Sequence, residues 1–258
     1  MNRFSTLFDS KKDQRILSIY FTAGYPQLES TVQIAEILQE SGVDFIEIGF
    51  PYSDPVADGP VIQHSSETAL RNGMTLEVLF EQLADLRKKV TIPVLLMGYV
   101  NPVLQYGVAR FCRSCAEVGI DGVIVPDLPM YEYEALYRDV FAQHGLSNIF
   151  LVTPQTAEDR IRKIDSLSQG FIYLLSSSAT TGKNLAVSEQ SDAYFTRLQS
   201  MNLTNPLVIG FGISDHETFV HANLFANGAI VGSAFVRLLE DEQYLEKIPG
   251  FIKQLKEG

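Results

Sequence analysis

The sequence predicts an α/β protein in which eight parallel strands close into a (β/α)8 barrel, a TIM barrel, with extra short helices. Three observations lead to this prediction. Short apolar, β-branched runs alternate with longer stretches of helical period, the runs are apolar at most positions, and about eight such units fit into 258 residues. Continuous apolarity is typical of strands covered on both faces. Eight strand–helix units in roughly 250 residues is the usual size of this barrel.

The predicted strands are short and evenly distributed along the chain. They are Leu17–Thr22, Asp44–Ile48, Pro93–Met97, Gly122–Val125, Ile149–Thr153, Phe171–Leu175, Pro206–Ile209 and Ala229–Val231. Right-handed crossovers between consecutive strands imply parallel pairing. A doubly wound open sheet is the alternative, but the turn after the first strand, Ala23–Pro26, lacks the Gly-rich fingerprint of that fold. Nothing marks a domain boundary, so residues 1–258 are expected to form a single domain.

The segments between the strands have the period of amphipathic helices. The clearest apolar series are positions 76, 79, 80, 83, 86 and 90, then 104, 108, 111, 112 and 115, then 133, 136, 137, 140 and 141. Two further helix starts, Thr156–Asp159 and Ser214–Glu217, fit the capping-box pattern.

Composition excludes several classes of protein. The formal charge is 20 − 31 = −11, which argues against a general nucleic-acid binder but leaves room for a local anion pocket. No apolar run reaches the ~18 residues of a membrane helix, and the N-terminal stretch has no signal-peptide core. The only cysteines, Cys112 and Cys115, cannot build a disulfide framework, and their spacing on an apolar helix face favours core packing over redox or metal chemistry. A cytoplasmic protein is expected.

Acidic residues follow the second predicted strand. Glu47 lies within Phe45-Ile-Glu-Ile-Gly49, where a lone buried carboxylate is costly unless it is paired or protonated. Burial would raise its pKa toward values useful in acid–base catalysis. The next loop is stiffened by prolines and carries Asp54 and Asp58. The alternatives are a structural role for Glu47 and ordinary turn chemistry for the two aspartates.

Glycines follow the last three predicted strands, at Gly182, Gly212 and Gly232. Backbone N–H groups freed by glycine can bind phosphate, and phosphate sites recur at this place in barrels, although a single glycine there can mark a tight turn alone. The four histidines show no metal-binding spacing, and Asp127 is either a site, an interface or a turn residue.

Together these motifs resemble the tryptophan synthase alpha chain family over essentially the full length. The segments that carry the resemblance are 45–63 (FIEIGFPYSDPVADGPVIQ), 20–26 (YFTAGYP), 97–102 (MGYVNP), 126–129 (PDLP), 210–213 (GFGI) and 232–233 (GS). The resemblance implies a lyase that cleaves indole-3-glycerol phosphate to indole and glyceraldehyde 3-phosphate in tryptophan biosynthesis. It also implies an alpha2beta2 complex with a beta chain that carries pyridoxal phosphate, and no cofactor or metal in this chain.

The resemblance also implies roles for individual residues. Glu47 and Asp58 would be catalytic, and Asp54 would support the loop near the beta chain. The substrate would be bound by Tyr20, Tyr173, Thr181, Gly182, Gly212, Gly232 and Ser233. One segment departs from the family pattern Ser-Arg-x-Gly-Val-Thr-Gly, since residues 176–182 read SSSATTG and have Ser177 at the arginine position. The alternatives are a non-catalytic regulatory subunit of this fold and a sugar-phosphate isomerase or epimerase.

Overall fold

A computed structural model describes residues 3–12, 14–175 and 189–258, and the strands of these segments form one parallel sheet. The spatial order of the strands is β5-β4-β3-β2-β1-β9-β8-β7-β6. Their bounds are β1 (Ile16–Thr22), β2 (Phe45–Gly49), β3 (Val94–Met97), β4 (Gly122–Ile124), β5 (Ser147–Asn148), β6 (Leu151–Val152), β7 (Ile172–Leu175), β8 (Leu207–Gly210) and β9 (Gly228–Val231).

The two ends of this order are joined by a single stretch of chain. Only Ile149 and Phe150 separate β5 from β6. The Ile149 N–H donates to the carbonyl of Val123 in β4 at 3.0 Å, and the Tyr173 N–H of β7 donates to the carbonyl of Phe150 at 2.9 Å. The fifth predicted strand therefore exists but changes its pairing partner halfway, from β4 to β7. This bridge closes the sheet, and the predicted eight-stranded barrel is confirmed.

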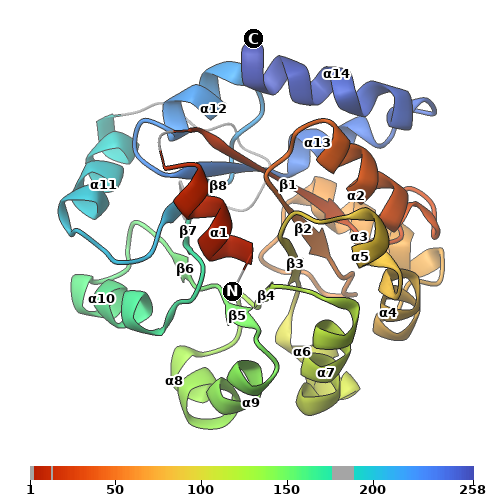
Figure 1. The fold of residues 1–258 in the computed structure, drawn as a ribbon, viewed down its shortest axis with the longest axis horizontal. Coiled ribbons are helices and arrows are strands. Elements are labelled where there is room, and N and C mark those ends of the chain that lie inside the picture. Colours follow the sequence, from red (N-terminus) through yellow and green to blue (C-terminus); the bar gives the residue numbers. More distant parts are fainter. Residues whose placement is uncertain (1–2, 13, 176–188) are drawn as a thin grey trace.

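Helices surround the sheet on its outer side (Figure 1). Among the described residues, no helix is both long and apolar enough to cross a bilayer. The helices are α1 (Arg3–Ser10), α2 (Ser30–Glu40), α3 (Pro60–Arg71), α4 (Leu76–Leu83), α5 (Leu86–Lys89), α6 (Val100–Tyr106), α7 (Val108–Val118), α8 (Met130–Glu132), the π-helix η1 (Tyr133–Tyr137), α9 (Arg138–Gln143), α10 (Glu158–Leu167), α11 (Glu189–Ser200), α12 (His216–Ala222), α13 (Ser233–Leu238) and α14 (Tyr244–Glu257).

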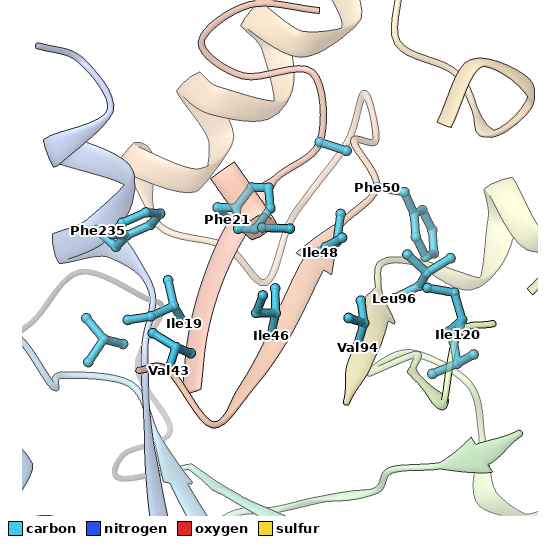
Figure 2. Packing of buried hydrophobic residues seen from close by; sticks show 14 of the residues in the cluster. Ile19, Phe21, Val43, Ile46, Ile48, Phe50, Val94, Leu96, Ile120 and Phe235 are labelled. Carbon is cyan, nitrogen blue, oxygen red and sulfur yellow. The ribbon is translucent and has the colours of Figure 1, made fainter. Parts of the chain in front are cut away.

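Alternation along each strand creates two separate apolar cores. Outward-facing side chains such as Ile19, Ile46 and Leu96 pack against the helices, as Figure 2 shows. Inward-facing side chains such as Phe45 and Leu95 fill the barrel. Helix α1 closes the N-terminal end of the barrel, where Phe4 contacts Phe45 edge-on with ring centroids 5.5 Å apart. These apolar groups close the interior of the barrel at this end.

The predicted helices exist, but several of their boundaries differ from the prediction. The series 76–90 divides into α4 and α5, and the series 104–115 divides at Gly107, whose φ is +91°. The capping-box prediction at Thr156 was wrong, and the one at Ser214 was displaced by one residue, because Asp215 and Thr218 form the capping box of α12. Helix α12 begins one residue later than expected, with Asp215 as the cap that accepts from the Thr218 N–H. Helix α10 has no side-chain cap, because the Thr156 hydroxyl instead accepts from the Thr153 N–H within the preceding turn.

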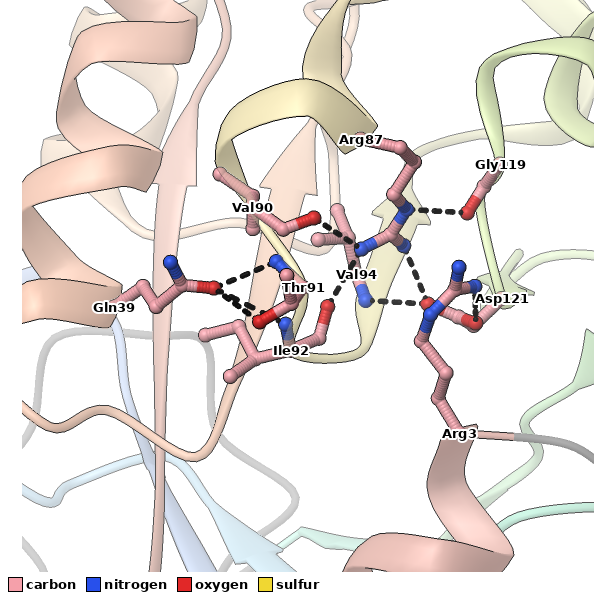
Figure 3. A network of polar contacts seen from close by, with 9 residues as sticks. All are labelled: Arg3, Gln39, Arg87, Val90, Thr91, Ile92, Val94, Gly119 and Asp121. Atoms are coloured by element: carbon pink, nitrogen blue, oxygen red, sulfur yellow. Dashed lines mark hydrogen bonds and ion pairs between the residues drawn. The ribbon is translucent and has the colours of Figure 1, made fainter.

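A polar network fixes the N-terminal ends of β3 and β4 (Figure 3). The Arg87 guanidinium donates to Asp121 Oδ2 at 2.6 Å and to the carbonyl groups of Gly119 and Ile92. Asp121 also accepts from the Val94 N–H of β3 at 2.8 Å. The Asp121 side chain is only 5% exposed and also pairs with Arg3, whose own side chain is 44% exposed. Loss of Arg87 would leave this buried charge with one partly solvated partner.

This network predicts a large difference between two neighbouring residues. Arg87→Met is expected to lower the free energy of unfolding by about 2–4 kcal/mol, because a buried ion pair and several hydrogen bonds are lost. Lys88→Met is the matched control, since its ion pair with Asp85 is exposed on both sides and should contribute less than about 1 kcal/mol. Denaturant unfolding of the two variants tests this, and equal losses would contradict it.

Candidate functional site

Two adjoining cavities open at the C-terminal ends of the strands. They share four wall residues, Tyr20, Asp58, Met97 and Phe211. Cavity A continues over Ile62, Tyr173, Gly212, Ile213, Ser214, Ile230, Gly232, Ser233, Ala234 and Arg237. Cavity B continues over Phe50, Tyr52, Pro55, Ala57, Ser66, Gly98, Tyr99, Pro126, Leu151, Thr153, Thr156, Arg160 and Leu175. Cavity A therefore contains all the predicted site residues that the structure describes, with the exception of Glu47.

Glu47 lies directly behind that wall. Its β2 position pairs in register with Tyr20 of β1, so the two side chains share the inner face of the barrel. The residue is 0% exposed, and within the described part of the chain neither carboxylate oxygen has a hydrogen-bond partner. Burial raises its pKa from 4.5 to about 8. The predicted buried, proton-binding carboxylate is therefore present.

Asp58 is held over the cavities by a neighbouring tyrosine. The Tyr99 hydroxyl donates to Asp58 Oδ2 at 3.1 Å and accepts from the Ala57 N–H at 3.0 Å, so one side chain fixes both the loop and its acid. Burial raises the pKa of Asp58 to about 6, while the hydrogen bond from Tyr99 opposes this rise. The Tyr52 ring packs on Tyr99 with centroids 5.3 Å apart and extends the support.

The two carboxyl groups thus differ in charge near neutral pH. With pKa values of about 8 for Glu47 and about 6 for Asp58, the first is mostly protonated and the second mostly ionised at pH 7. Two acids whose pKa values differ in this way can supply a proton donor and a negative charge to one substrate. Burial raises the pKa values of Tyr20 and Tyr173, and the nearby carboxylates raise them further, so both hydroxyls stay neutral.

Two strand-end glycines make room for the tyrosines. A Cβ atom on Gly49 would lie 2.2 Å from the Tyr20 hydroxyl, and one on Gly210 would lie 2.0 Å from the Tyr173 hydroxyl. Any larger residue would therefore displace the ring across it. The need for glycine at these two positions was not predicted, because it is imposed by tyrosine side chains on neighbouring strands.

Phe211 was also missed. It has a φ of +72°, a left-handed conformation that non-glycine residues rarely adopt, and Gly212 follows with +80°. The Phe211 ring contacts the Tyr173 ring edge-on at a centroid distance of 6.2 Å and forms part of both cavities. A strained residue in a cavity wall is a recognised mark of function. The only sequence signal was its position between two glycines.

Other candidates lie elsewhere. Asp54 is exposed and accepts from the Ser53 hydroxyl, outside both cavities. Asp127 accepts from the Val100 N–H at 2.8 Å, which ties the end of β4 to α6 and fits its turn interpretation. Cys112 and Cys115 are buried in the core, as predicted. Thr181 and Gly182, with the whole 176–182 segment, lie outside the described residues. Across the described ranges, no three His, Cys, Asp or Glu side chains are grouped to hold a metal ion.

Comparisons with known proteins agree on one family. The family model described as tryptophan synthase alpha chain matches residues 6–256. A tryptophan synthase alpha chain of Christiangramia forsetii is 53% identical over 256 residues, which cover 99% of both chains. The crystal structure of tryptophan synthase subunit alpha from Legionella pneumophila has a TM-score of 0.89 at 33% identity, covering 99% of this chain and 97% of that one. A chain in the tryptophan synthase complex of Pyrococcus furiosus has a TM-score of 0.83 at 31% identity, covering 93% and 97%.

The buried carboxyl group of Glu47 predicts a pH-dependent stability. Its pKa is higher in the folded than in the unfolded protein, so the folded state binds this proton more tightly. Stability from this group is fully present below the unfolded pKa near 4.5 and is lost as pH rises through about 8. Glu47→Gln removes this loss and should raise the free energy of unfolding at pH 8.5 by on the order of 2 kcal/mol relative to its effect at pH 5.

Unfolding at both pH values tests this expectation. The exposed Glu117→Gln serves as the control and should show no such difference. An equal effect of Glu47→Gln at the two pH values would mean that the carboxyl group is paired in the folded protein.

Proposed function

This chain belongs to the tryptophan synthase alpha chain family of lyases, and we propose that Glu47 and Asp58 carry out its reaction. The reaction is the cleavage of indole-3-glycerol phosphate to indole and glyceraldehyde 3-phosphate in tryptophan biosynthesis. The observation that carries the proposal is the placement of two carboxyl groups at one cavity, Glu47 buried beside Tyr20 and Asp58 bound by Tyr99, with pKa values of about 8 and about 6. A retro-aldol cleavage needs both a proton donor and a site of negative charge.

The first step is protonation of the indole ring. The bond to be broken joins C3 of the indole to a carbon that carries a hydroxyl group, and C3 cannot leave as a bare carbanion. Protonated Glu47 donates its proton to C3, which leaves an indolenine-like cation. Ionised Asp58 accepts a hydrogen bond from the ring N–H and stabilises this positive charge. Rotation of the Glu47 side chain past Tyr20 brings the carboxyl group to the cavity, and no described residue binds it in its buried position.

The second step breaks the carbon–carbon bond. Glu47, now a carboxylate, takes the proton from the hydroxyl group on the adjacent carbon. The hydroxyl oxygen forms the aldehyde carbonyl, the C3–carbon bond breaks, and its electron pair returns to the indole ring. The Glu47 proton is restored, so the cycle is balanced without an added cofactor.

We assign the phosphate end of the substrate to cavity A. Cavity A contains Gly212, Gly232 and Ser233, whose backbone N–H groups we assign to the phosphate, together with the predicted Gly182. The positive φ of Gly212 and the absence of side chains at the glycines allow the anion to approach the backbone. Tyr20 and Tyr173 line the same cavity, where we expect them to contact the indole ring, and we assign Thr181 to closure over Asp58.

The kinetic test changes each acid to its amide. Glu47→Gln cannot exchange protons and is expected to lower kcat by about 10²–10⁴-fold, because general acid–base catalysis typically contributes that much. Asp58→Asn should lower kcat and remove the acidic limb near pH 6 from the pH profile. Exposed Asp54→Asn is the control and should change the chemical step far less. Normal kcat in a folded Glu47→Gln variant would exclude this residue as the acid.

A beta chain is the partner that we propose, in an alpha2beta2 tetramer in which the beta chain holds pyridoxal phosphate. Support comes from the family and from a similar chain in the Pyrococcus furiosus complex. Direct transfer of indole to that partner would require closed loops around Asp58. Adding the cognate beta chain is therefore expected to raise the rate of indole formation. If no complex forms in sizing or calorimetry, the altered 176–182 segment no longer supports the partnership.

A further inference from the structure

Cavity A contains one cationic side chain among its described wall residues, that of Arg237. This arginine is exposed, and within the described part of the chain its guanidinium forms no hydrogen bond or ion pair. By contrast, the guanidinium of Arg87 is paired with Asp121. An unpaired guanidinium in the wall of an anion pocket is therefore available to a ligand.

Helix geometry brings this side chain to the phosphate end of the cavity. Ser233 and Arg237 are four residues apart on α13 and so lie on the same helix face. Side chains on a helix lean toward its N-terminus, so Arg237 covers the turn that begins at Ser233. Ser233 and Gly232 are the residues assigned to the phosphate. The guanidinium is thus directed to the place where that group would lie.

The positive charge of Arg237 can offset electrostatic repulsion of the phosphate, which uncharged backbone N–H groups do poorly. The protein carries a net charge of −11, and Asp215 directly follows the wall residue Ser214 in the sequence. The pKa of Asp215 is lowered chiefly by its hydrogen bond from the Thr218 N–H, so this side chain is an anion that repels an approaching phosphate dianion. Neutral N–H groups orient a phosphate, but a full positive charge offsets such repulsion and acts over a longer range.

We propose that Arg237 is a phosphate-positioning residue, which contacts the phosphate group of the substrate and steers it into cavity A. The inference rests on the proposed function, because it needs a phosphorylated substrate bound at Gly232 and Ser233. It assigns to Arg237 a role in binding and capture rather than in the bond-breaking step.

The test is steady-state indole formation by the full-length chain. Arg237→Gln should raise KM for indole-3-glycerol phosphate by roughly three- to tenfold with kcat nearly unchanged, as expected for a partly exposed charge-assisted contact. Arg237→Lys should restore most of the loss. The salt dependence of kcat/KM should become flatter in Arg237→Gln, a change that a purely structural role would not produce. Arg113→Gln, an exposed arginine on α7 in neither cavity, is the matched control.

Binding of glycerol 3-phosphate measured by calorimetry provides a second readout that does not depend on catalysis. It should weaken in Arg237→Gln and stay unchanged in Arg113→Gln. If the unmodified chain forms indole but Arg237→Gln keeps its KM, its salt dependence and its affinity for glycerol 3-phosphate, the inference about Arg237 is wrong while the proposed function stands. If the unmodified chain forms no indole with or without a beta chain, the proposed function itself fails.

Discussion

A buried carboxyl group that finds no hydrogen-bond partner among the described residues is the constraint on which this site depends. The closed parallel sheet directs every second side chain of β2 inward, and Glu47 occupies one of those positions. In such surroundings the ionised form is strongly disfavoured, so the group retains a proton near neutral pH. The apolar plug of α1 below it preserves this environment, because it seals the end of the barrel away from the cavities. Burial of Glu47 lowers the stability of the fold at higher pH, but it keeps the carboxyl group protonated near neutral pH.

The second acid is supported in a different way. Asp58 is on a loop, where no sheet restrains it, and the hydroxyl group of Tyr99 supplies the missing restraint. The same hydroxyl group accepts from the loop backbone at Ala57, so loop position and carboxylate orientation are coupled. A hydrogen bond to the ionised form also favours its charge, which keeps the pKa of Asp58 below that of Glu47. Burial alone sets the pKa of Glu47, whereas the hydrogen bond from Tyr99 opposes the effect of burial on Asp58. The two carboxyl groups therefore differ in charge near neutral pH.

The sequence predicted the repeating parts of this protein better than its local exceptions. Continuous apolarity located the strands within one or two residues, since burial on both faces leaves no other pattern. The fifth strand was predicted as one segment because its change of partner depends on neighbours distant in sequence. Cap positions failed for a related reason, since Ser214 and Asp215 are both good caps and only the chain path decides between them. Burial of Glu47 was predictable from its position in an apolar strand, whereas the catalytic roles of Glu47 and Asp58 came from the family resemblance and stay predictions. The family membership suggested by these motifs is confirmed. Tyr99, Phe211 and Gly49 act through tertiary contacts that one sequence does not reveal.

An acidic protein that binds a dianion needs a local electrostatic potential at the binding site that is more positive than the potential around the whole molecule. The net charge of −11 opposes any phosphate in solution, and ionised Asp215, which follows the wall residue Ser214, adds to this repulsion. Backbone N–H groups carry no net charge, so they provide specificity for the shape of the phosphate without reversing this repulsion. A single guanidinium at the wall reverses it only within about one Debye length, roughly 8–10 Å at physiological salt. Placing that charge on α13, rather than beside Glu47, also leaves the proton on Glu47 in place, because a nearby cation would favour the ionised carboxylate and lower its pKa. The distance between the cation and the acid is therefore as much a part of the site as the residues themselves.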